Sequence, residues 1–443
     1  MSIKKTIKKI IHYDKLYDSL KTSFLYQWWK KINGKIANFI NWNPSKDFFI
    51  IWVTGTNWKT TTCNLLHKML NDQLAPTVMI STACIKIGNE TELNDKKMTS
   101  LDTFQLQSTL AKAKAAGCKI AVLEASSQWL DQNRFEWVTF DYAVLTNITR
   151  DHLDYHKDMD NYAMAKKKLF KYVLANKKDT KYASFPADDK IWREWNDEMA
   201  FDKKITYSLQ KTAMLQAENI IEWDDETKFD TKYLWSTYKT SIKLLWAYNV
   251  YNFLAALSVW IQIWLDIEKC IQSLSEFEWV SWRMEKVTHN WVNYFIDFAH
   301  DPDALDKTLT YLHKIKWDNK LILVFWAPWN RDIWKRPEMW IIWRNYSDIV
   351  IATDDDPDTE NRINILKQLS EKIDYENKQN KEFYIIPERE FAIKFAIELA
   401  KPWDIVMIAW KWHEPIQRTN FGTRKWNDKI ELEKILNNEK FNI

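Results

Sequence analysis

A short apolar run over residues 48–53 leads into Gly55-Thr56-Asn57-Trp58-Lys59-Thr60-Thr61, and a helical pattern continues to about residue 70. Strand, loop and helix in this order place backbone N–H groups and a helix N-terminus around one concave site that suits phosphate groups. Lys59 would reach the outer phosphates, and Thr60 would hold a Mg²⁺ ion. The segment therefore predicts a nucleotide-binding α/β domain. Trp58 conflicts with this prediction, because such a loop needs glycine where the backbone approaches closely or has a positive φ.

The composition gives this conflict a wider meaning. The chain has 27 Trp and 5 Gly, whereas glycine averages about 7% of residues in proteins. Our hypothesis is that the gene encodes glycine with UGA, as some bacterial lineages do, and that UGA has been read as Trp. The alternative is a genuinely Trp-rich protein, and UGG codons at positions 58, 410 and 412 would refute the hypothesis. Tryptophan falls where loops usually carry glycine at Trp52, Trp58, Trp326, Trp329, Trp334, Trp410 and Trp412.

The bulk properties describe an ordinary globular chain. A length of 443 residues suggests about three domains. The net charge of +3 gives no indication of a nucleic-acid partner. Four scattered cysteines favour reduced thiols and a cytoplasmic location. No apolar run reaches the roughly 18 residues that a transmembrane helix needs.

The pattern along the chain predicts three segments. Residues 1–46 are basic, aromatic and helical; a helix packed on the next domain is one interpretation, and weak contact with a membrane surface is another. Strands and helices alternate in residues 47–280 and again in 281–443, which predicts two α/β domains with mostly parallel sheets. We expect strands at 48–53, 77–81, 119–123, 140–146, 292–298, 320–325, 348–353, 383–386 and 404–409, a β-rich stretch at 224–243, and helices at 59–70, 103–116, 249–265, 302–315 and 390–400.

With glycine at position 58 the loop reads GTNGKTT, and further motifs follow it in a fixed order. They are Met98-Thr-Ser100, Leu123-Glu-Ala-Ser-Ser127, Leu130-Asp-Gln-Asn-Arg134, Thr146-Asn-Ile-Thr-Arg-Asp-His-Leu-Asp-Tyr-His156, Tyr162-Ala-Met-Ala-Lys166, Asn249-Val-Tyr-Asn252, Arg283-Met-Glu285 and Asp297-Phe-Ala-His-Asp-Pro-Asp303. This set resembles the Mur ligase family, the ATP-dependent amide-bond-forming enzymes of peptidoglycan synthesis. Within the family it is most similar to the MurE ligases, which add the third residue of the stem peptide.

The resemblance implies a central P-loop ATPase domain and a C-terminal Rossmann-like domain that binds the amino acid. It also implies an N-terminal domain that grips the UDP group, which we expect to be truncated here because only about 46 residues precede the loop. The cofactors implied are ATP and Mg²⁺. We expect a monomer whose partners are small molecules, namely a nucleotide-sugar peptide and an amino acid.

The resemblance also assigns roles to individual residues. Glu124 follows a predicted strand, at the sheet edge where ligands of α/β folds bind, and its carboxylate suits Mg²⁺. Catalysis is assigned to Lys59, Glu124, His152 and Lys166. ATP contacts are assigned to Gly55, Thr56, Asn57, Trp58, Lys59, Thr60, Thr61, Asn147, Asn249, Asn252, Arg283, Asp297 and His300. The metal ligands implied are Thr60, Glu124, His152 and Lys166, the last as a carbamate.

Two residue groups are assigned to the substrates. The residues expected to bind the acceptor peptide are Thr99, Ser100, Ser126, Gln132 and Arg134. Those expected to bind the incoming amino acid are Arg331, Asp355, Asp356, Asp358 and Glu414. Diaminopimelate-adding relatives carry Asp-Asn-Pro-Arg where this chain has Asp355-Asp356-Pro357-Asp358. A carboxylate at 358 would repel the distal carboxylate of diaminopimelate and suit a distal ammonium. We therefore expect L-lysine, or a similar diamino acid such as ornithine.

The reaction implied is amide formation through an acyl phosphate, with catalysis by positioning and charge stabilisation. Two alternatives remain open. One is a related ligase, similar to cyanophycin synthetase or folylpolyglutamate synthase, with an acceptor that carries no UDP. The other is a non-catalytic Mur-like binding protein, which a genuine Trp58 would favour.

Overall fold

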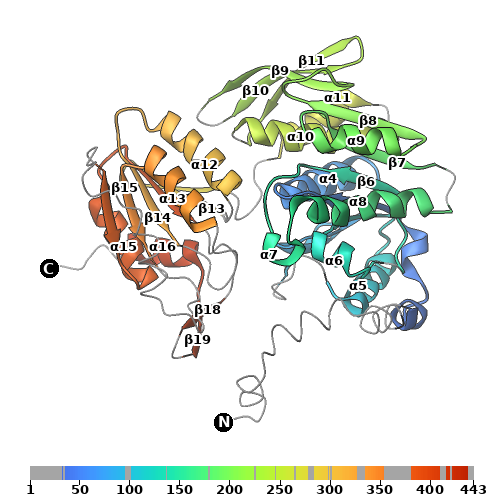
Figure 1. The fold of residues 1–443 in the computed structure, drawn as a ribbon, viewed down its shortest axis with the longest axis horizontal. Helices are drawn as coiled ribbons and strands as arrows, with labels where there is room; N and C mark the ends of the chain where they lie inside the picture. The colour runs from blue at the N-terminus through green and yellow to red at the C-terminus, as the bar shows by residue number, and fades with distance from the viewer. Residues whose placement is uncertain are drawn as a thin grey trace. The chain divides into compact units, whose positions relative to one another are not determined.

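The structure is a computed structural model, and its backbone forms two compact units that are described separately. The first consists of residues 1–148 and 155–278, and the second of residues 149–154 and 279–443 (Figure 1). The domain boundaries predicted at 46/47 and 280/281 stay predictions. The residues that the structure describes are 32, 35–94, 101–135, 137–177, 180–223, 226–244, 246–263, 266–277, 284–297, 299, 302–326, 335–353, 381–409, 416–419 and 422–437.

In its described part the first unit is built on an eleven-stranded sheet with the order β11-β10-β9-β8-β7-β6-β1-β5-β2-β3-β4. Neighbouring strands are parallel from β2 across to β9, and each end of the sheet is antiparallel. The strands are β1 (Phe49–Thr54), β2 (Thr77–Ile80), β3 (Cys84–Ile87), β4 (Glu90–Leu93), β5 (Ile120–Glu124), β6 (Tyr142–Leu145), β7 (Tyr182–Pro186), β8 (Lys203–Ser208), β9 (Leu215–Glu222), β10 (Thr227–Tyr233) and β11 (Ser236–Ile242).

Helices pack along this sheet, and the central strands are buried as a result. Strands β2, β5 and β6 are buried throughout, as is β1 after its first residue. Such burial is expected of parallel strands with helices on both faces. The helical elements are η1 (Pro44–Asp47), α4 (Lys59–Gln73), α5 (Thr103–Ala115), α6 (Ser127–Asp131), α7 (Leu153–His156), α8 (Met159–Ala175), α9 (Lys190–Glu198), α10 (Ala247–Ile263) and α11 (Ile267–Ser275).

The described part of the second unit holds a six-stranded sheet with the order β12-β13-β17-β14-β15-β16, and a separate hairpin of β18 and β19. All neighbours in the sheet are parallel except β12 and β13. The elements are β12 (Glu285–His289), β13 (Val292–Asp297), α12 (Pro302–Ile315), β14 (Leu321–Phe325), α13 (Lys335–Tyr346), β15 (Ile349–Ala352), β16 (Glu382–Ile385), α15 (Arg389–Leu399), β17 (Ile405–Ala409), β18 (Ile416–Thr419), β19 (Gly422–Lys425) and α16 (Asp428–Asn437).

The predicted fold class is confirmed. Every strand predicted in the two runs is present, and each begins within two residues of its predicted start. The prediction named no strand at β3, β4, β7, β8, β9, β12 or the hairpin β18–β19, and no helix at α6, α7, α8, α9, α11, α13 or α16. All four cysteines are buried and unpaired, as the expectation of reduced thiols requires.

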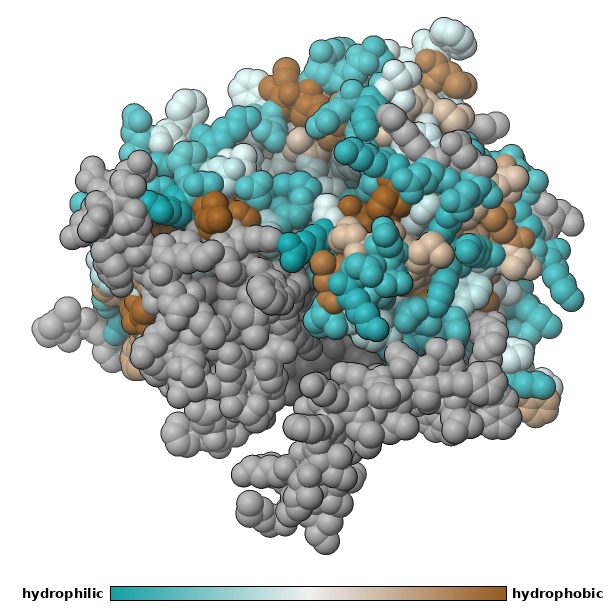
Figure 2. All heavy atoms as spheres, viewed as in Figure 1, coloured by the Kyte–Doolittle hydropathy of each residue, from teal (hydrophilic) through white to brown (hydrophobic). Residues whose placement is uncertain are grey.

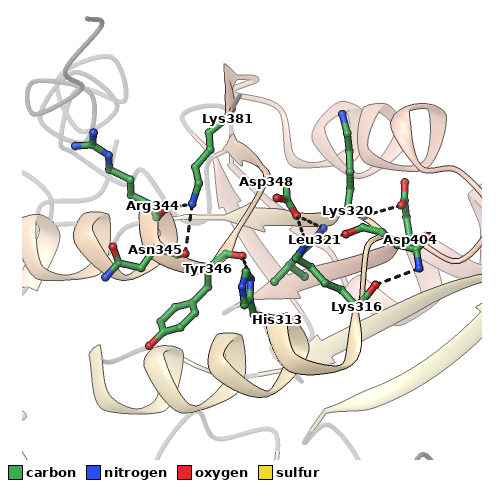
Figure 3. Close-up of polar contacts among 11 residues, drawn as sticks. His313, Lys316, Lys320, Leu321, Arg344, Asn345, Tyr346, Asp348, Lys381 and Asp404 are labelled. Carbon is green, nitrogen blue, oxygen red and sulfur yellow. Dashed lines mark hydrogen bonds and ion pairs between the residues drawn. The ribbon is translucent and has the colours of Figure 1, made fainter. Parts of the chain in front are cut away.

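The edge of the second sheet where its parallel strands begin is held by two aspartates (Figure 3). Asp348 accepts a hydrogen bond from the backbone N–H of Leu321 at 2.8 Å, and Asp404 accepts one from that of Lys320 at 2.8 Å. At the same edge helix α13 ends, where Lys381 donates to the carbonyl of residue 344 and His313 Nδ1 lies 2.7 Å from the carbonyl of Tyr346. Donors at these positions satisfy the last carbonyls of the helix and complement its dipole.

The described surface visible in Figure 2 is mainly hydrophilic, with apolar side chains in separate small groups. Within the described residues, no helix combines the length and apolar character that crossing a bilayer requires. Before β1, the side chains of Ile36, Phe39 and Ile40 are exposed. The membrane-surface contact suggested for residues 1–46 stays a prediction.

His67 on α4 gives the first unit a predicted pH dependence. Its side chain is 6% exposed, and burial, followed by the charge of Lys86, lowers its pKa from 6.5 to about 4, against smaller opposite contributions from the Thr77 and Gly88 backbone and from Asp72. The unfolded chain therefore takes up this proton first as the pH falls. We expect His67 to reduce the free energy of unfolding by up to roughly 3 kcal/mol between about pH 6.5 and pH 4.

Urea unfolding at several pH values would measure this effect, with His67→Gln as the comparison. The glutamine variant should lose less stability than the unsubstituted chain as the pH falls from 7 to 4. Equal losses in the two proteins would show that His67 does not contribute.

Candidate nucleotide and metal site

The loop Gly55–Trp58 lies at the carboxyl end of β1, between β5 and β6 in the middle of the sheet. Residues that follow β6 hold it in place. The backbone N–H of Thr56 donates to the carbonyl of Asn147, and that of Asn57 donates to Asn147 Oδ1, both at 2.9 Å. Thr146 Oγ1 donates to the carbonyl of Asn57 at 2.7 Å. The loop is therefore held by hydrogen bonds to the residues that follow β6.

Gly55 is required by close contact. A Cβ at this position would lie 1.8 Å from Thr146 Oγ1 and 3.0 Å from the backbone nitrogen of Asn147. We expect Gly55→Ala to lower the free energy of unfolding by about 1–3 kcal/mol, because the loop or strand must shift. The matched control is Gly88→Ala, where φ is also positive but no atom lies within 4 Å of the added carbon. Urea unfolding should show the larger loss at position 55, and equal losses would contradict the contact argument.

Helix α4 begins directly after the loop and presents its first turn to the same concavity. Its N-cap residue, Trp58, has a φ of 68° and makes no side-chain capping hydrogen bond. The first N–H groups of a helix have no partner within the helix, so an anion at this end is favoured. Lys59 Nζ donates to the carbonyl of Thr56 at 2.7 Å, so the ammonium group lies over the loop. This arrangement suits a nucleotide's phosphates.

Glu124, at the end of β5, lies beside the start of α4. One carboxylate oxygen accepts from Thr60 Oγ1 at 3.0 Å and from the Thr82 N–H at 2.9 Å, and the other accepts from Thr82 Oγ1 at 3.0 Å. A hydroxyl and a buried carboxylate this close fit Mg²⁺, which takes oxygen ligands and usually keeps water or phosphate oxygens in the remaining positions. The described residues contain no group of three His, Cys, Asp or Glu side chains placed for a metal, so a site here would rely on such additional oxygens.

Lys166 on α8 is 1% exposed and lies against the same loop. Its Nζ donates to the carbonyl of Gly55 at 2.6 Å and lies 4.3 Å from the centre of the Tyr162 ring. Tyr162 in turn donates its hydroxyl to Thr56 Oγ1 at 3.1 Å. The unmodified Lys166 side chain thus stabilises the loop through the Gly55 carbonyl. Its role as a carbamate ligand stays a prediction.

The three asparagines assigned to ATP have different surroundings. Asn147 holds the loop, and its buried Nδ2 has no hydrogen-bond partner in the described structure, so a donor remains for a ligand. Asn252 is 1% exposed and donates to Asn249 Oδ1 at 3.0 Å, while Thr62 Oγ1 lies 3.4 Å from Asn252 Oδ1. The contact with Thr62 links α10 to α4, so Asn252 has a structural role whether or not it contacts the nucleotide.

Three residues assigned to the acceptor lie around α6. Ser126 caps this helix by accepting from the N–H of Trp129 at 3.4 Å. Arg134 stacks over the Trp129 ring at 4.1 Å, and Gln132 Nε2 donates to the hydroxyl of Tyr155 at 3.2 Å. Buried Gln132 Oε1 and Arg134 Nε have no protein partner within the described residues. Their assignment to the acceptor stays a prediction.

The remaining predicted residues belong to the second unit or lie outside the described residues, and their roles stay predictions. His152 lies on the segment 149–154, which groups with the second unit, and its N–H donates to Asp151 Oδ1 at 2.8 Å. Asp297 ends β13 in that unit and accepts from the N–H of Met284 at 2.7 Å. Residues outside the described part are Thr99, Ser100, Arg283, His300, Arg331, Asp355, Asp356, Asp358 and Glu414.

Three residues at the site were not predicted: Thr82, Thr146 and Tyr162. Thr82 and Thr146 directly follow or nearly follow strands whose carboxyl ends share an edge with β1. That position was the available signal, because polar residues at this edge contact ligands in α/β folds. Tyr162 opens the motif that contains Lys166, and that motif was its signal, although its contact with Thr56 depends on how α8 packs.

A parallel α/β unit whose central strand turns through such a loop into a helix is a P-loop type of nucleotide-binding domain. Comparison with protein families narrows this class. The Mur ligase middle domain matches residues 53–260, and the Mur ligase glutamate ligase domain matches residues 282–409. The chain belongs to the Mur ligase family, whose members are ATP-dependent ligases.

Relatives and solved structures agree with the family. The chain is 33% identical over 402 residues to a UDP-N-acetylmuramoyl-L-alanyl-D-glutamate--2,6-diaminopimelate ligase of Halalkalibacterium halodurans, with 90% of this chain and 81% of the relative covered. A ligase of the same name from Thermosynechococcus vestitus is 34% identical, with coverages of 88% and 76%. A solved structure of a ligase with this name aligns with a TM-score of 0.63 at 28% identity, over 93% of this chain and 84% of that one. The structure of MurF from Thermotoga maritima in complex with ADP shares the fold, with a TM-score of 0.66 at 15% identity over 92% and 84% of the chains.

Proposed function

We propose that the chain is an ATP- and Mg²⁺-dependent ligase that joins a diamino acid to UDP-N-acetylmuramoyl-L-alanyl-D-glutamate in peptidoglycan synthesis. The observation that carries the proposal is the loop with Lys59 over it and the Thr60–Glu124 pair at its edge, at 3.0 Å. The names of the relatives supply the acceptor and the class of amino acid. Buried thiols are consistent with action in the cytoplasm.

In the proposed reaction the acceptor's carboxylate attacks the γ-phosphate of ATP to give an acyl phosphate and ADP, and the amine of the diamino acid then attacks the acyl carbon and displaces phosphate. The chain's contribution is to bind and orient: the α4 N-terminus and Lys59 would hold the phosphates, and Glu124 and Thr60 would hold the metal. Mg²⁺, when bound, neutralises phosphate charge. Two further ligands are proposed: His152 through a ring nitrogen, and a carbamate on Lys166 through an oxygen. No side-chain nucleophile is required, because positioning and electrostatics supply the catalysis.

For the amino acid, we propose L-lysine or another diamino acid with a distal ammonium. The support comes from Asp358, which replaces the arginine of diaminopimelate-adding relatives. A carboxylate at this position favours a cation and disfavours a second carboxylate. The relatives cited above are named as diaminopimelate ligases, so the distinction rests on this loop.

Phosphate release with the UDP-dipeptide acceptor would test the proposal over a panel of L-lysine, L-ornithine, meso-diaminopimelate and L-alanine. We expect release only when acceptor and diamino acid are both present, with lysine preferred over diaminopimelate by at least about tenfold. Asp358→Arg should shift the preference towards diaminopimelate. Faster turnover of diaminopimelate by the unsubstituted loop would refute the lysine assignment, and no turnover with any member would refute the proposed function.

A further inference from the structure

Backbone geometry separates the tryptophans into two kinds. We propose that positions 42, 58, 246, 291, 317 and 403, which carry Trp in this sequence, are glycine in the functional enzyme. Only position 58 was singled out by the sequence pattern. The inference rests on the chain's own turns and helix ends, so it stands independently of the amino acid that the ligase adds.

The first observation is the set of left-handed residues. Among the described residues, fourteen other than glycine have a positive φ, and six of them are Trp against four Asn. Asparagine tolerates this conformation, whereas a bulky aromatic residue there is a true outlier. Six such outliers of one residue type indicate a common cause. The six are Trp42 (58°), Trp58 (68°), Trp246 (80°), Trp291 (65°), Trp317 (51°) and Trp403 (78°).

Trp403 occupies the glycine position of a type II turn. Lys401, Pro402, Trp403 and Asp404 form a four-residue turn, closed by a hydrogen bond of 3.0 Å from the N–H of Asp404 to the carbonyl of Lys401. Proline is common at the second position of a type II turn, and the third position needs a φ near 80°, which glycine supplies. The observed φ is 78°.

Trp291 occupies the glycine position of a hairpin turn. Strands β12 and β13 pair antiparallel up to His289 and Val292, so Asn290 and Trp291 form a two-residue loop. Their φ values are 48° and 65°. A two-residue loop with both values positive is typical of a type I′ turn, for which Asn-Gly is the preferred sequence.

The helical stretch at residues 35–40 also ends in a left-handed tryptophan. The N–H of Trp42 donates to the carbonyl of Phe39 at 3.1 Å, and that of Asn43 donates to the carbonyl of Asn38 at 2.8 Å. This pair of bonds defines a Schellman motif, whose left-handed residue is usually glycine. Trp42 has that place and is 89% exposed, so its ring gains little from packing. Trp317, two residues past the end of α12, is likewise left-handed and 81% exposed.

Trp58 connects the inference to the nucleotide site. Its indole stacks on Tyr248 with a centroid distance of 5.7 Å and an interplanar angle of 0°. The ring therefore packs against the start of α10, while the Trp58 backbone forms the N-cap of α4, the helix end where the phosphates are proposed to bind. A glycine there would relieve the backbone and remove the ring from the loop.

Other tryptophans are ordinary core residues and serve as controls. Trp426 is 4% exposed and donates its Nε1 to Asp428 Oδ1 at 2.8 Å. Trp52 is fully buried in β1, donates to the carbonyl of Thr139 at 3.0 Å, and packs 4.5 Å from the Phe135 ring. Neither has a positive φ. The backbone thus gives no support for glycine at position 52, which the sequence pattern had grouped with position 58.

The test compares glycine and alanine at the same sites by thermal unfolding. In the full chain we expect Trp403→Gly and Trp42→Gly each to raise Tm by about 2–4 °C. The matching alanine variants should gain less, because alanine keeps a Cβ in a left-handed backbone. Trp426→Gly should lower Tm by several degrees. If the printed chain unfolds too early to compare, the same Trp residues can be restored singly in a six-glycine chain, where each should lower Tm.

Nucleotide binding and the gene provide two further readouts. Trp58→Gly should tighten Mg-ADP binding at least about tenfold by calorimetry, with no acceptor or amino acid present. UGA codons at the six positions and UGG at 426 would support the proposal. Alanine variants as stable as the glycine variants, or UGG at the six positions, would overturn it. Because these readouts need no ligase turnover, failure of the proposed function would not be mistaken for failure of this inference.

Discussion

Replacing Lys59 with methionine, in a chain that carries glycine at position 58, is expected to reduce ligase turnover by about 10²–10³-fold. Lys59 is the cation that lies directly over the loop, where its Nζ is 2.7 Å from the carbonyl of Thr56. Methionine keeps the length of the side chain and removes its charge. The loss should therefore fall on stabilisation of the phosphates, with little change in the folded structure.

Steady-state phosphate release would measure the effect, and unfolding by urea would show that the variant remains folded. Lys68→Met is the matched control, because Lys68 lies on the same helix but forms an exposed ion pair with Asp72. That variant should turn over normally. If Lys59→Met turned over within threefold of the parent, Lys59 would not be a catalytic residue.

The second large effect is expected on the stability of the second unit. Arg389 and Asp428 are the first residues of α15 and α16, and both side chains are buried. Arg389 donates twice to the carboxylate of Asp428, through Nε and Nη2 at 2.7 Å each, and Nη2 also donates to the carbonyl of Ala409 at 2.9 Å. Asp428→Ala leaves the guanidinium buried without its counter-charge. We expect it to lower the free energy of unfolding of this unit by about 3–5 kcal/mol.

Denaturant unfolding followed by a probe in the second unit would test this, since the two units need not unfold together. The control is the double variant Arg389→Met with Asp428→Leu, which replaces the ion pair by apolar side chains. It should recover much of the loss, because the main cost of the single variant is an unpaired buried charge. A single variant within 1 kcal/mol of the parent would show that water or another group satisfies Arg389.

The parts of the fold that the sequence predicted are those set by local patterns. The central strands are short apolar runs buried on both faces, and Gly55 to Thr61 combines a strand end, a loop and a helix start. Such signals do not depend on distant residues. Glu124 was identified in the same way, as a carboxylate at the end of a strand.

The rest depends on contacts between distant segments. Thr82 binds Glu124 because β2 is next to β5, and Thr146 and Asn147 hold the loop because β6 is next to β1. A sequence pattern gives the strands but not their order. Asn252 illustrates the converse, since its motif suggests a ligand contact while its burial against α4 gives it a structural task. For His152, Asp297 and the amino-acid loop, the predicted roles remain to be tested by experiment.

The hydrogen bonds of Asn147 and Lys166 to the loop have a thermodynamic consequence. The carbonyls and N–H groups of this loop already form hydrogen bonds within the protein. The loop therefore has little conformational entropy to lose when a ligand binds. The loop would then be a preorganised site for a triphosphate, and little binding energy would be lost in ordering it. The entropy change on binding would come mainly from released water and counterions.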